Sequence, residues 1–388
     1  MRYKQKILCL ILIFTIILSF NGCFHNKIQV NINQTSNKYI TNEDYQNYLN
    51  LYSKMAMTED GYYFINNNHL CFFDKESLET IIVCNKVNCE HNDDSCTAYF
   101  SVLNFYPIQL AYYDDALYLL GWETEGANIH HNYIYQISLD NYKRKKSAFI
   151  SNSNGISSAV FIIHRGYIYY VSNTDTMQKN TTELYRKQLG NTDKKDKGEK
   201  IFDITDYGTQ IFGLSAYGNN VFFSVASYED ESGNGYNTSL NCIDIHTLKS
   251  KTIIENNQYS YFADDQYIYY ERDKNTVNKI NLDTNEETFF CNIDGPCYIS
   301  ADENYLYFDN QQAIFINEDT AVRLITAVDK KTGKVITSVA PKNKDDECLF
   351  GGNDFIFFKE ITSEGLQKYY SIDKTKLTQN KIDYIDMS

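Results

Sequence analysis

The chain has 388 residues, a formal net charge of −14 and only three prolines, while its 34 tyrosines and 23 phenylalanines make it strongly aromatic. The acidic balance argues against nucleic-acid binding and against docking on anionic lipid headgroups through a basic patch. Tyrosine and phenylalanine favour half-buried pleated surfaces, so the composition predicts a protein rich in β-strands.

The first 22 residues have the pattern of a secretory signal peptide. Arg2, Lys4 and Lys6 form a basic start, residues 7–20 carry no charge, and Gly22 precedes Cys23. This apolar run is shorter than the ~20 residues that a membrane-spanning helix needs. Gly22-Cys23 resembles the bacterial lipoprotein signal, and the resemblance implies lipidation at Cys23. The alternatives are an ordinary secretion signal and an uncleaved anchor helix.

An internal repeat dominates the rest of the chain. A turn-forming group rich in Asp, Asn or Gly is followed each time by four or five aromatic and aliphatic residues. The copies occupy residues 59–66, 113–121, 164–173, 217–225, 264–273, 302–310 and 352–360. Their spacing of 38 to 55 residues is measured between Asp60, Asp115, Arg165, Asn219, Asp265, Glu303 and Asn353. Propeller blades have about this length, so the repeat predicts an all-β fold with a single seven-bladed β-propeller.

Most copies continue into a second strand that ends in a polar turn, and a third strand often follows. Asp and Asn suit such turns because they hydrogen-bond nearby backbone and tolerate left-handed conformations. The alternative is a pair of β-sandwich domains, since regular short strands are also typical of those. We predict a signal peptide over 1–22, a flexible tether over 23–39 and the propeller over 40–388. Residues 40–58 are expected to supply a strand that closes the ring beside the last blade.

Cysteines gather in residues 83–100, between the first two repeats. Cys84, Cys89, His91 and Cys96 offer three thiolates and an imidazole, a ligand set that suits a structural zinc ion. Outside the cytoplasm the same cysteines favour disulfides, for which the candidates are Cys71, Cys84, Cys89, Cys96, Cys291 and Cys297. A reduced or mixed state is the third alternative, while Cys242 and Cys348 are candidate buried thiols. No orienting group for a catalytic thiol is evident.

Together, the cysteine segment and the repeats resemble a family of lipoproteins from Gram-positive anaerobes. Its members carry a C-N-K-x-x-C-x-H-x4-C segment before A-Y-F, and a propeller like that of the low-density-lipoprotein receptor or TolB. The matching residues are Cys84, Asn85, Lys86, Cys89, His91, Cys96, Ala98, Tyr99 and Phe100. The resemblance implies a lipid-anchored propeller outside the cytoplasm, and it implies no established activity.

We therefore predict a monomeric propeller that is anchored at Cys23 to the outer face of the cytoplasmic membrane. It is expected to act as a binding or scaffolding module for a protein, peptide or glycan. Two or more acyl chains anchor a protein stably. The alternative is a lyase or hydrolase with a site at the mouth of the central channel. The sequence contains no motif for a catalytic nucleophile, a zinc protease or a phosphate-binding loop, so we expect no enzyme. His130-His131 are expected to face solvent, and Trp122 to be half-buried.

Overall fold

The computed structural model describes residues 38–46, 54–101, 105–125, 129–153, 161–174, 179–256, 260–273, 275–295, 297–311, 322–351, 354–362, 365–379 and 382–387. All of them belong to one compact unit, Asn31–Ser388. The predicted signal peptide, Cys23 and the tether up to residue 37 lie outside the described residues. Within the described part the chain is almost entirely β, and its one helical element is the 3-10 helix η1, Lys374–Gln379.

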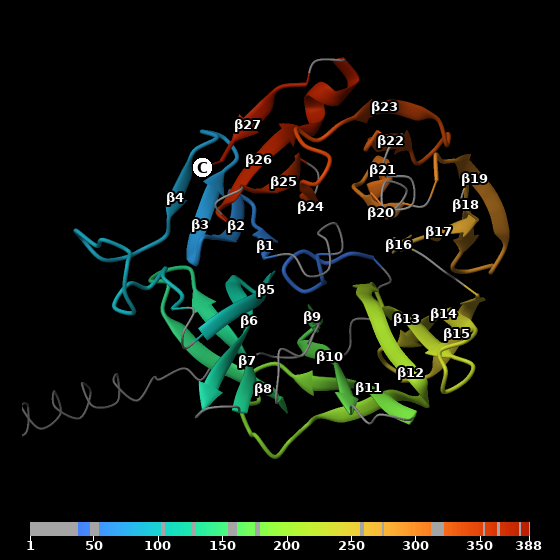
Figure 1. The fold of residues 1–388 in the computed structure, drawn as a ribbon, viewed down its shortest axis with the longest axis horizontal. Helices are drawn as coiled ribbons and strands as arrows, with labels where there is room; N and C mark the ends of the chain where they lie inside the picture. Colours follow the sequence, from blue (N-terminus) through green and yellow to red (C-terminus); the bar gives the residue numbers. More distant parts are fainter. Residues whose placement is uncertain are drawn as a thin grey trace, which may run out of the picture. The chain divides into compact units, whose positions relative to one another are not determined.

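The described strands form blades of four antiparallel strands (Figure 1), as the sequence predicts. The first blade contains β1 (Met55–Met57), β2 (Gly61–Asn66), β3 (His69–Asp74) and β4 (Thr80–Ile82). The second contains β5 (Phe105–Tyr113), β6 (Ala116–Glu125), β7 (Ile129–Ser138) and β8 (Arg144–Ser153). In both blades strand order follows chain order, because short hairpin turns join each strand to its neighbour.

The third and fourth blades share one long strand. β9 (Phe161–His164), β10 (Tyr167–Thr174) and β11 (Lys179–Gln188) pair with the first half of β12 (Glu199–Tyr217). The second half of β12 pairs with β13 (Asn220–Tyr228), which is followed by β14 (Tyr236–Asp244) and β15 (Ser250–Glu255). The register of β12 shifts between Tyr207 and Gln210, so a β-bulge marks the passage from one blade to the next.

The last three blades again have four strands each. The fifth contains β16 (Tyr261–Ala263), β17 (Tyr267–Asp273), β18 (Thr276–Asn281) and β19 (Glu287–Asn292). The sixth contains β20 (Tyr298–Ala301), β21 (Tyr305–Asp309), β22 (Ile325–Asp329) and β23 (Val335–Val339). The seventh contains β24 (Glu347–Gly351), β25 (Phe355–Ile361), β26 (Gln367–Asp373) and β27 (Tyr384–Asp386). The described residues therefore form seven blades, which confirms the all-β propeller.

Each repeat of the sequence forms the second strand of a blade, and this strand is buried on both faces. In β10, for example, Ile168, Tyr169 and Tyr170 are at most 1% exposed. Apolar clusters fill the space between neighbouring sheets, including the space between the last blade and the first. The aromatic repeat is thus the core of the propeller, because a strand between two blades has no solvent-facing side.

The closing seam, defined here as the contact between β1–β4 and β24–β27, is held by side chains. Tyr62 and Phe64 of β2 pack against Phe357 of β25 and Tyr369 of β26. The prediction that residues 40–58 close the ring beside the last blade is wrong. Their described strand, β1, pairs with β2, and the last blade is completed by its own β27. A short turn makes β2 the nearest partner of β1.

A test of the seam uses the tyrosine hydroxyl that crosses it. Tyr369 is 2% exposed, and its hydroxyl donates to the Ile65 carbonyl over 3.0 Å. Tyr369→Phe leaves that carbonyl without this donor, so we expect the free energy of unfolding to fall by about 1 kcal/mol. Tyr236→Phe, at a position 51% exposed, is the control and should stay within ~0.5 kcal/mol in urea unfolding. Equal effects of the two variants would contradict a specific role for this contact.

Candidate metal centre

The cysteine segment forms the connection between the first blade and the second. It leaves β4 at Val83, whose amide donates to the Leu70 carbonyl over 3.0 Å, and it returns to the same blade at residues 98–100. There the Leu70 amide donates to the Ala98 carbonyl, and the Phe100 amide donates to the Asn68 carbonyl, both over 2.8 Å. Both ends of the loop are therefore fixed to the β2–β3 hairpin and β3.

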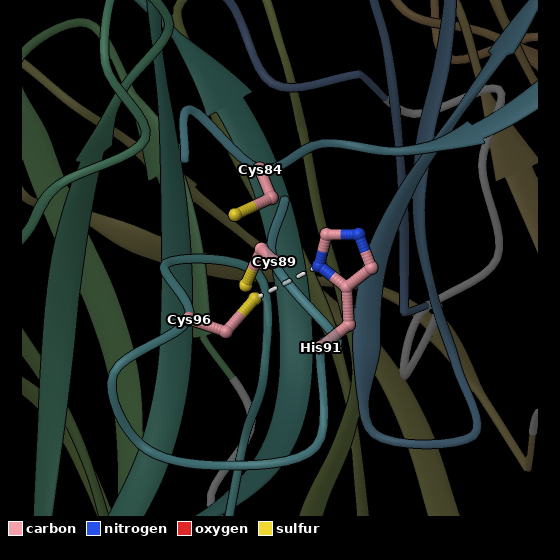
Figure 2. Close-up of side chains that lie close together, drawn as sticks. All are labelled: Cys84, Cys89, His91 and Cys96. Carbon is pink, nitrogen blue, oxygen red and sulfur yellow. Dashed lines mark hydrogen bonds between the residues drawn. The ribbon is translucent and has the colours of Figure 1, made fainter. Parts of the chain in front are cut away.

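Four side chains of this loop converge on one point, as Figure 2 shows. The sulfur atoms of Cys84, Cys89 and Cys96 and a ring nitrogen of His91 all lie within 4.8 Å of one another. Nδ1 of His91 is 3.3 Å from Sγ of Cys96. A tetrahedral zinc ion with Zn–S bonds of ~2.3 Å would hold its sulfur ligands roughly 3.8 Å apart, so the four atoms are close to a zinc arrangement.

Backbone geometry helps to turn these side chains inward. Asn88 and His91 have φ angles of 55° and 56°, in the left-handed region that residues other than glycine seldom adopt. The carbonyl of His91 accepts a hydrogen bond from Nε2 of His69 over 2.6 Å, which fixes the backbone at that position. Left-handed residues persist where the surrounding structure specifies them, and they gather at ligand sites.

The surroundings of Cys84 favour its thiolate form. Partial burial would raise its pKa, but hydrogen bonds to its sulfur from the Lys86 amide (3.5 Å) and the Thr97 hydroxyl (3.8 Å), with the nearby thiols of Cys96 and Cys89, lower the pKa to about 6. Burial raises the pKa of Cys96 to about 11. A metal ion would deprotonate it on binding, because the thiolate is the ligand.

The five described cysteines outside this loop lie in four other apolar cores. Cys71 packs between the first and last blades, on the opposite face of the first sheet from the core that contains Cys96. Cys291 and Cys297 lie together in the core between the fifth and sixth blades. Cys242 and Cys348 are buried in two further cores. The structure joins none of the eight described cysteines in a disulfide; it brings three of the disulfide candidates together around His91 and keeps Cys71 apart.

A second polar site, which no motif in the sequence predicts, lies at the other end of the blades. Residues 38–46, named here the N-terminal brace, lie against the turns that join the first and second strands of several blades. Arg165 donates to the Asp44 carboxylate (2.8 and 3.3 Å), the Asn219 side chain (2.6 Å) and the Lys38 carbonyl (3.2 Å). Asp44 and Arg165 are both buried, so each neutralises the other where water is excluded.

His164 completes the contact between the brace and the blades. Its Nδ1 accepts from the Tyr45 amide over 3.2 Å and its Nε2 donates to the Gly218 carbonyl over 2.7 Å, the pattern of a neutral imidazole. The brace also reaches the neighbouring blades. The Asp114 amide donates to the Asn42 carbonyl over 3.0 Å, and the Gln46 side chain bonds both the amide and the carbonyl of Met57.

Two predictions about single residues have different outcomes. Trp122 is half-buried, as expected, and stacks on Tyr106 with ring centroids 5.9 Å apart. His131 is buried, so the expectation that it faces solvent is wrong. Its strand β7 lies inside the second blade, where its ring is 6.3 Å from that of Phe149. The side chain of His130 lies outside the described residues.

Comparisons with known proteins identify the fold alone. No protein-family model matches the chain, and no curated protein matches it. Among solved structures, a prolyl endopeptidase matches with a TM-score of 0.53 at 10% identity, covering 86% of this chain and 48% of that one. Puromycin hydrolase matches with a TM-score of 0.49 at 9% identity, covering 85% and 51%. The β-propeller domain of the Trilobed protease from Pyrococcus furiosus matches with a TM-score of 0.47 at 9% identity, covering 87% and 97%.

The chain thus spans about half the length of the prolyl endopeptidase and of puromycin hydrolase. The similarity to the prolyl endopeptidase supports the propeller, and at this identity it says nothing about activity. In the described part of the chain, no helix is both long enough and apolar enough to cross a membrane.

Proposed function

We propose that this chain is a lipid-anchored, extracytoplasmic propeller that binds a protein, peptide or glycan, and that it acts by binding and not by catalysis. The observation that carries the proposal is the N-terminal brace, which occupies the ends of the blades where the first and second strands turn. We name this end of the propeller the turn face. The opposite end, with the β2–β3 hairpin and the cysteine loop of residues 83–100, is the loop face, and we assign the ligand to it.

Side chains with the character of a ligand platform gather where β1, β5 and β24 begin, on the loop face. Tyr106, 38% exposed, stacks on Trp122. Lys54 places its ammonium 4.7 Å from the centre of the Tyr106 ring. Burial and the nearby charge of Lys359, partly offset by that of Glu347, lower the pKa of Lys54 to about 8. Aromatic rings beside charged groups suit sugar rings or peptide side chains, since both present apolar and polar surfaces.

Binding is tested with the soluble domain presented to a glycan array and to a displayed peptide library. We expect one of these classes to bind, and Tyr106→Ala to weaken that binding about tenfold, or ~1.4 kcal/mol, because the stacked ring is removed. Glu303→Ala, at an exposed position on the turn face, is the control and should bind like the parent. A larger loss of binding affinity in Glu303→Ala than in Tyr106→Ala would contradict our assignment of the ligand to the loop face.

The lipid anchor is tested separately at Cys23. In cells fed an alkyne-bearing fatty acid, the parent chain should take up the label and stay with the membrane fraction. Cys23→Ser removes the thiol to which the diacylglyceryl group would be attached, so the label should disappear and the protein should leave the membrane. Cys242→Ser controls for a general effect of losing a cysteine. Label that persists in Cys23→Ser would reject the anchor.

The cofactor of this proposal is a structural zinc ion held by Cys84, Cys89, His91 and Cys96. Three thiolates and one imidazole in a closed set are typical of structural zinc. Soft thiolate ligands also suit iron, so the metal content has to be measured. The hydrogen bonds to the Cys84 sulfur from Lys86 and Thr97 are the outer contacts that orient a metal ligand.

A further inference from the structure

The loop that carries the four metal ligands (residues 83–100, named here the metal loop) packs on the face of the first blade that is turned away from the closing seam. At this seam no strand pairing between β1–β4 and β24–β27 is found among the described residues, because each of the two blades is built from its own consecutive strands. Ladder hydrogen bonds therefore contribute nothing to closure there. The seam depends on side-chain packing and on a few hydrogen bonds.

Two of these hydrogen bonds form a reciprocal pair at the loop face. The side-chain amide of Asn67 donates to the Gln367 carbonyl, and the Gln367 amide donates to Oδ1 of Asn67, each over 3.1 Å. Asn67 lies at the tip of the β2–β3 hairpin, and Gln367 is the first residue of β26. The position of this hairpin tip decides whether the pair can form, so whatever fixes the hairpin also fixes the seam.

The metal loop contacts the β2–β3 hairpin on the side away from the last blade. The Phe100 amide donates to the carbonyl of Asn68, and Nε2 of His69 donates to the carbonyl of His91. The rings of His69 and Tyr99 are 5.4 Å apart. Three consecutive residues, Asn67 to His69, thus contact the last blade at one end and the metal loop at the other.

We propose that a zinc ion bound by Cys84, Cys89, His91 and Cys96 locks the closing seam through the β2–β3 hairpin. This inference rests on the metal centre proposed above. The ion would join Cys84, two residues after the end of β4, to Cys96, two residues before the return at residues 98–100. The loop then holds the His91 carbonyl where His69 can reach it, and the hairpin holds Asn67 against Gln367. In this role the metal substitutes for strand pairing across the seam, which is not found among the described residues.

Hydrogen exchange measures the lock directly, because the Gln367 amide bonds across the seam. The experiment uses the full chain in detergent under reducing conditions, loaded with one equivalent of zinc or stripped with a chelator. Exchange in peptides covering 65–72 and 365–370 should rise about tenfold on stripping, while exchange over 268–280 in the fifth blade should change less than about twofold. Zinc bound and released is counted in the same samples.

A variant separates the lock from the site. His69→Ala removes the hydrogen bond to the His91 carbonyl and leaves all four ligands in place, so it should bind zinc while exchanging fast at 365–370 with or without the metal. Asn92→Ala, an exposed change in the same loop, should behave like the parent. If zinc binds and is released without a change in hydrogen exchange at residues 365–370, the lock is contradicted while the metal centre is supported. A chain that binds no zinc overturns both.

Discussion

Cys96→Ser is expected to abolish the dependence of stability on zinc. The Cys96 sulfur is buried and lies among the other three ligand atoms, so a serine leaves an incomplete site in a loop with little core of its own. A ligand that binds only the folded state stabilises it by about 4 kcal/mol when its free concentration is 1,000 times its Kd. Urea unfolding of the parent should show a zinc increment of this order, and Cys96→Ser should show none.

The matched control is Cys242→Ser. Cys242 is also a buried cysteine, but it lies in the core between the fourth and fifth blades, where its thiol donates to the Asn220 side chain over 3.2 Å. This variant should lose some packing energy and keep the full zinc increment. If Cys96→Ser retained the increment, or if zinc failed to stabilise the parent, the metal would not be held by this loop.

Acid is expected to destabilise the contact between the N-terminal brace and the blades through His164. Burial lowers the pKa of His164 to about 4 despite the Asp44 carboxylate 3.8 Å away, and the nearby charge of Arg165 acts in the same direction as burial. In the unfolded chain the His164 side chain has a pKa near 6.5, so it binds a proton more readily there than in the folded protein. The contribution of His164 is therefore complete above about pH 6.5 and is lost as the pH falls towards 4, by up to roughly 3 kcal/mol.

His164→Gln isolates this titration. A glutamine amide can donate to the Gly218 carbonyl and accept from the Tyr45 amide, and it carries no proton in this range. Chemical unfolding of the variant between pH 4 and 7 should show a flatter pH dependence than the parent, by about the same 3 kcal/mol. His246→Gln, at an exposed position, should leave the parent's slope unchanged. A slope equal in all three proteins would show that His164 does not titrate in this way.

Much of the fold could be predicted from the sequence because the repeat is physical. A strand between two blades must be apolar on both faces. An aromatic and aliphatic run such as residues 167–171 occurs in each of the seven repeats and predicts such a strand. The shared strand β12 could not be predicted, because a bulge near Tyr207 replaces the turn that would mark a blade boundary. The prediction for residues 40–58 is wrong because sequence alone does not say which of two neighbouring edges a short strand such as Met55–Met57 joins.

Some features of the candidate metal site could be predicted from the sequence, and others could not. The spacing within residues 84–96 predicts a compact ligand set, because four potential ligand side chains in one short loop must lie close together. Left-handed turns at Asn88 and His91 are not visible in the sequence, yet they bring the ring to the thiols. The contact of Asp44 with Arg165 joins residues far apart in the chain, and their sequence patterns predict only a strand and a turn. Only the folded blades bring them together.

The measurement that tests the central claim most directly is the metal content of the intact chain, prepared under reducing conditions, by native mass spectrometry and elemental analysis. One zinc ion per chain, released on denaturation and absent from Cys96→Ser, is the result that we predict. A metal-free parent with Cys84, Cys89 and Cys96 in disulfides, or iron in place of zinc, would contradict the assignment of a zinc centre to this loop.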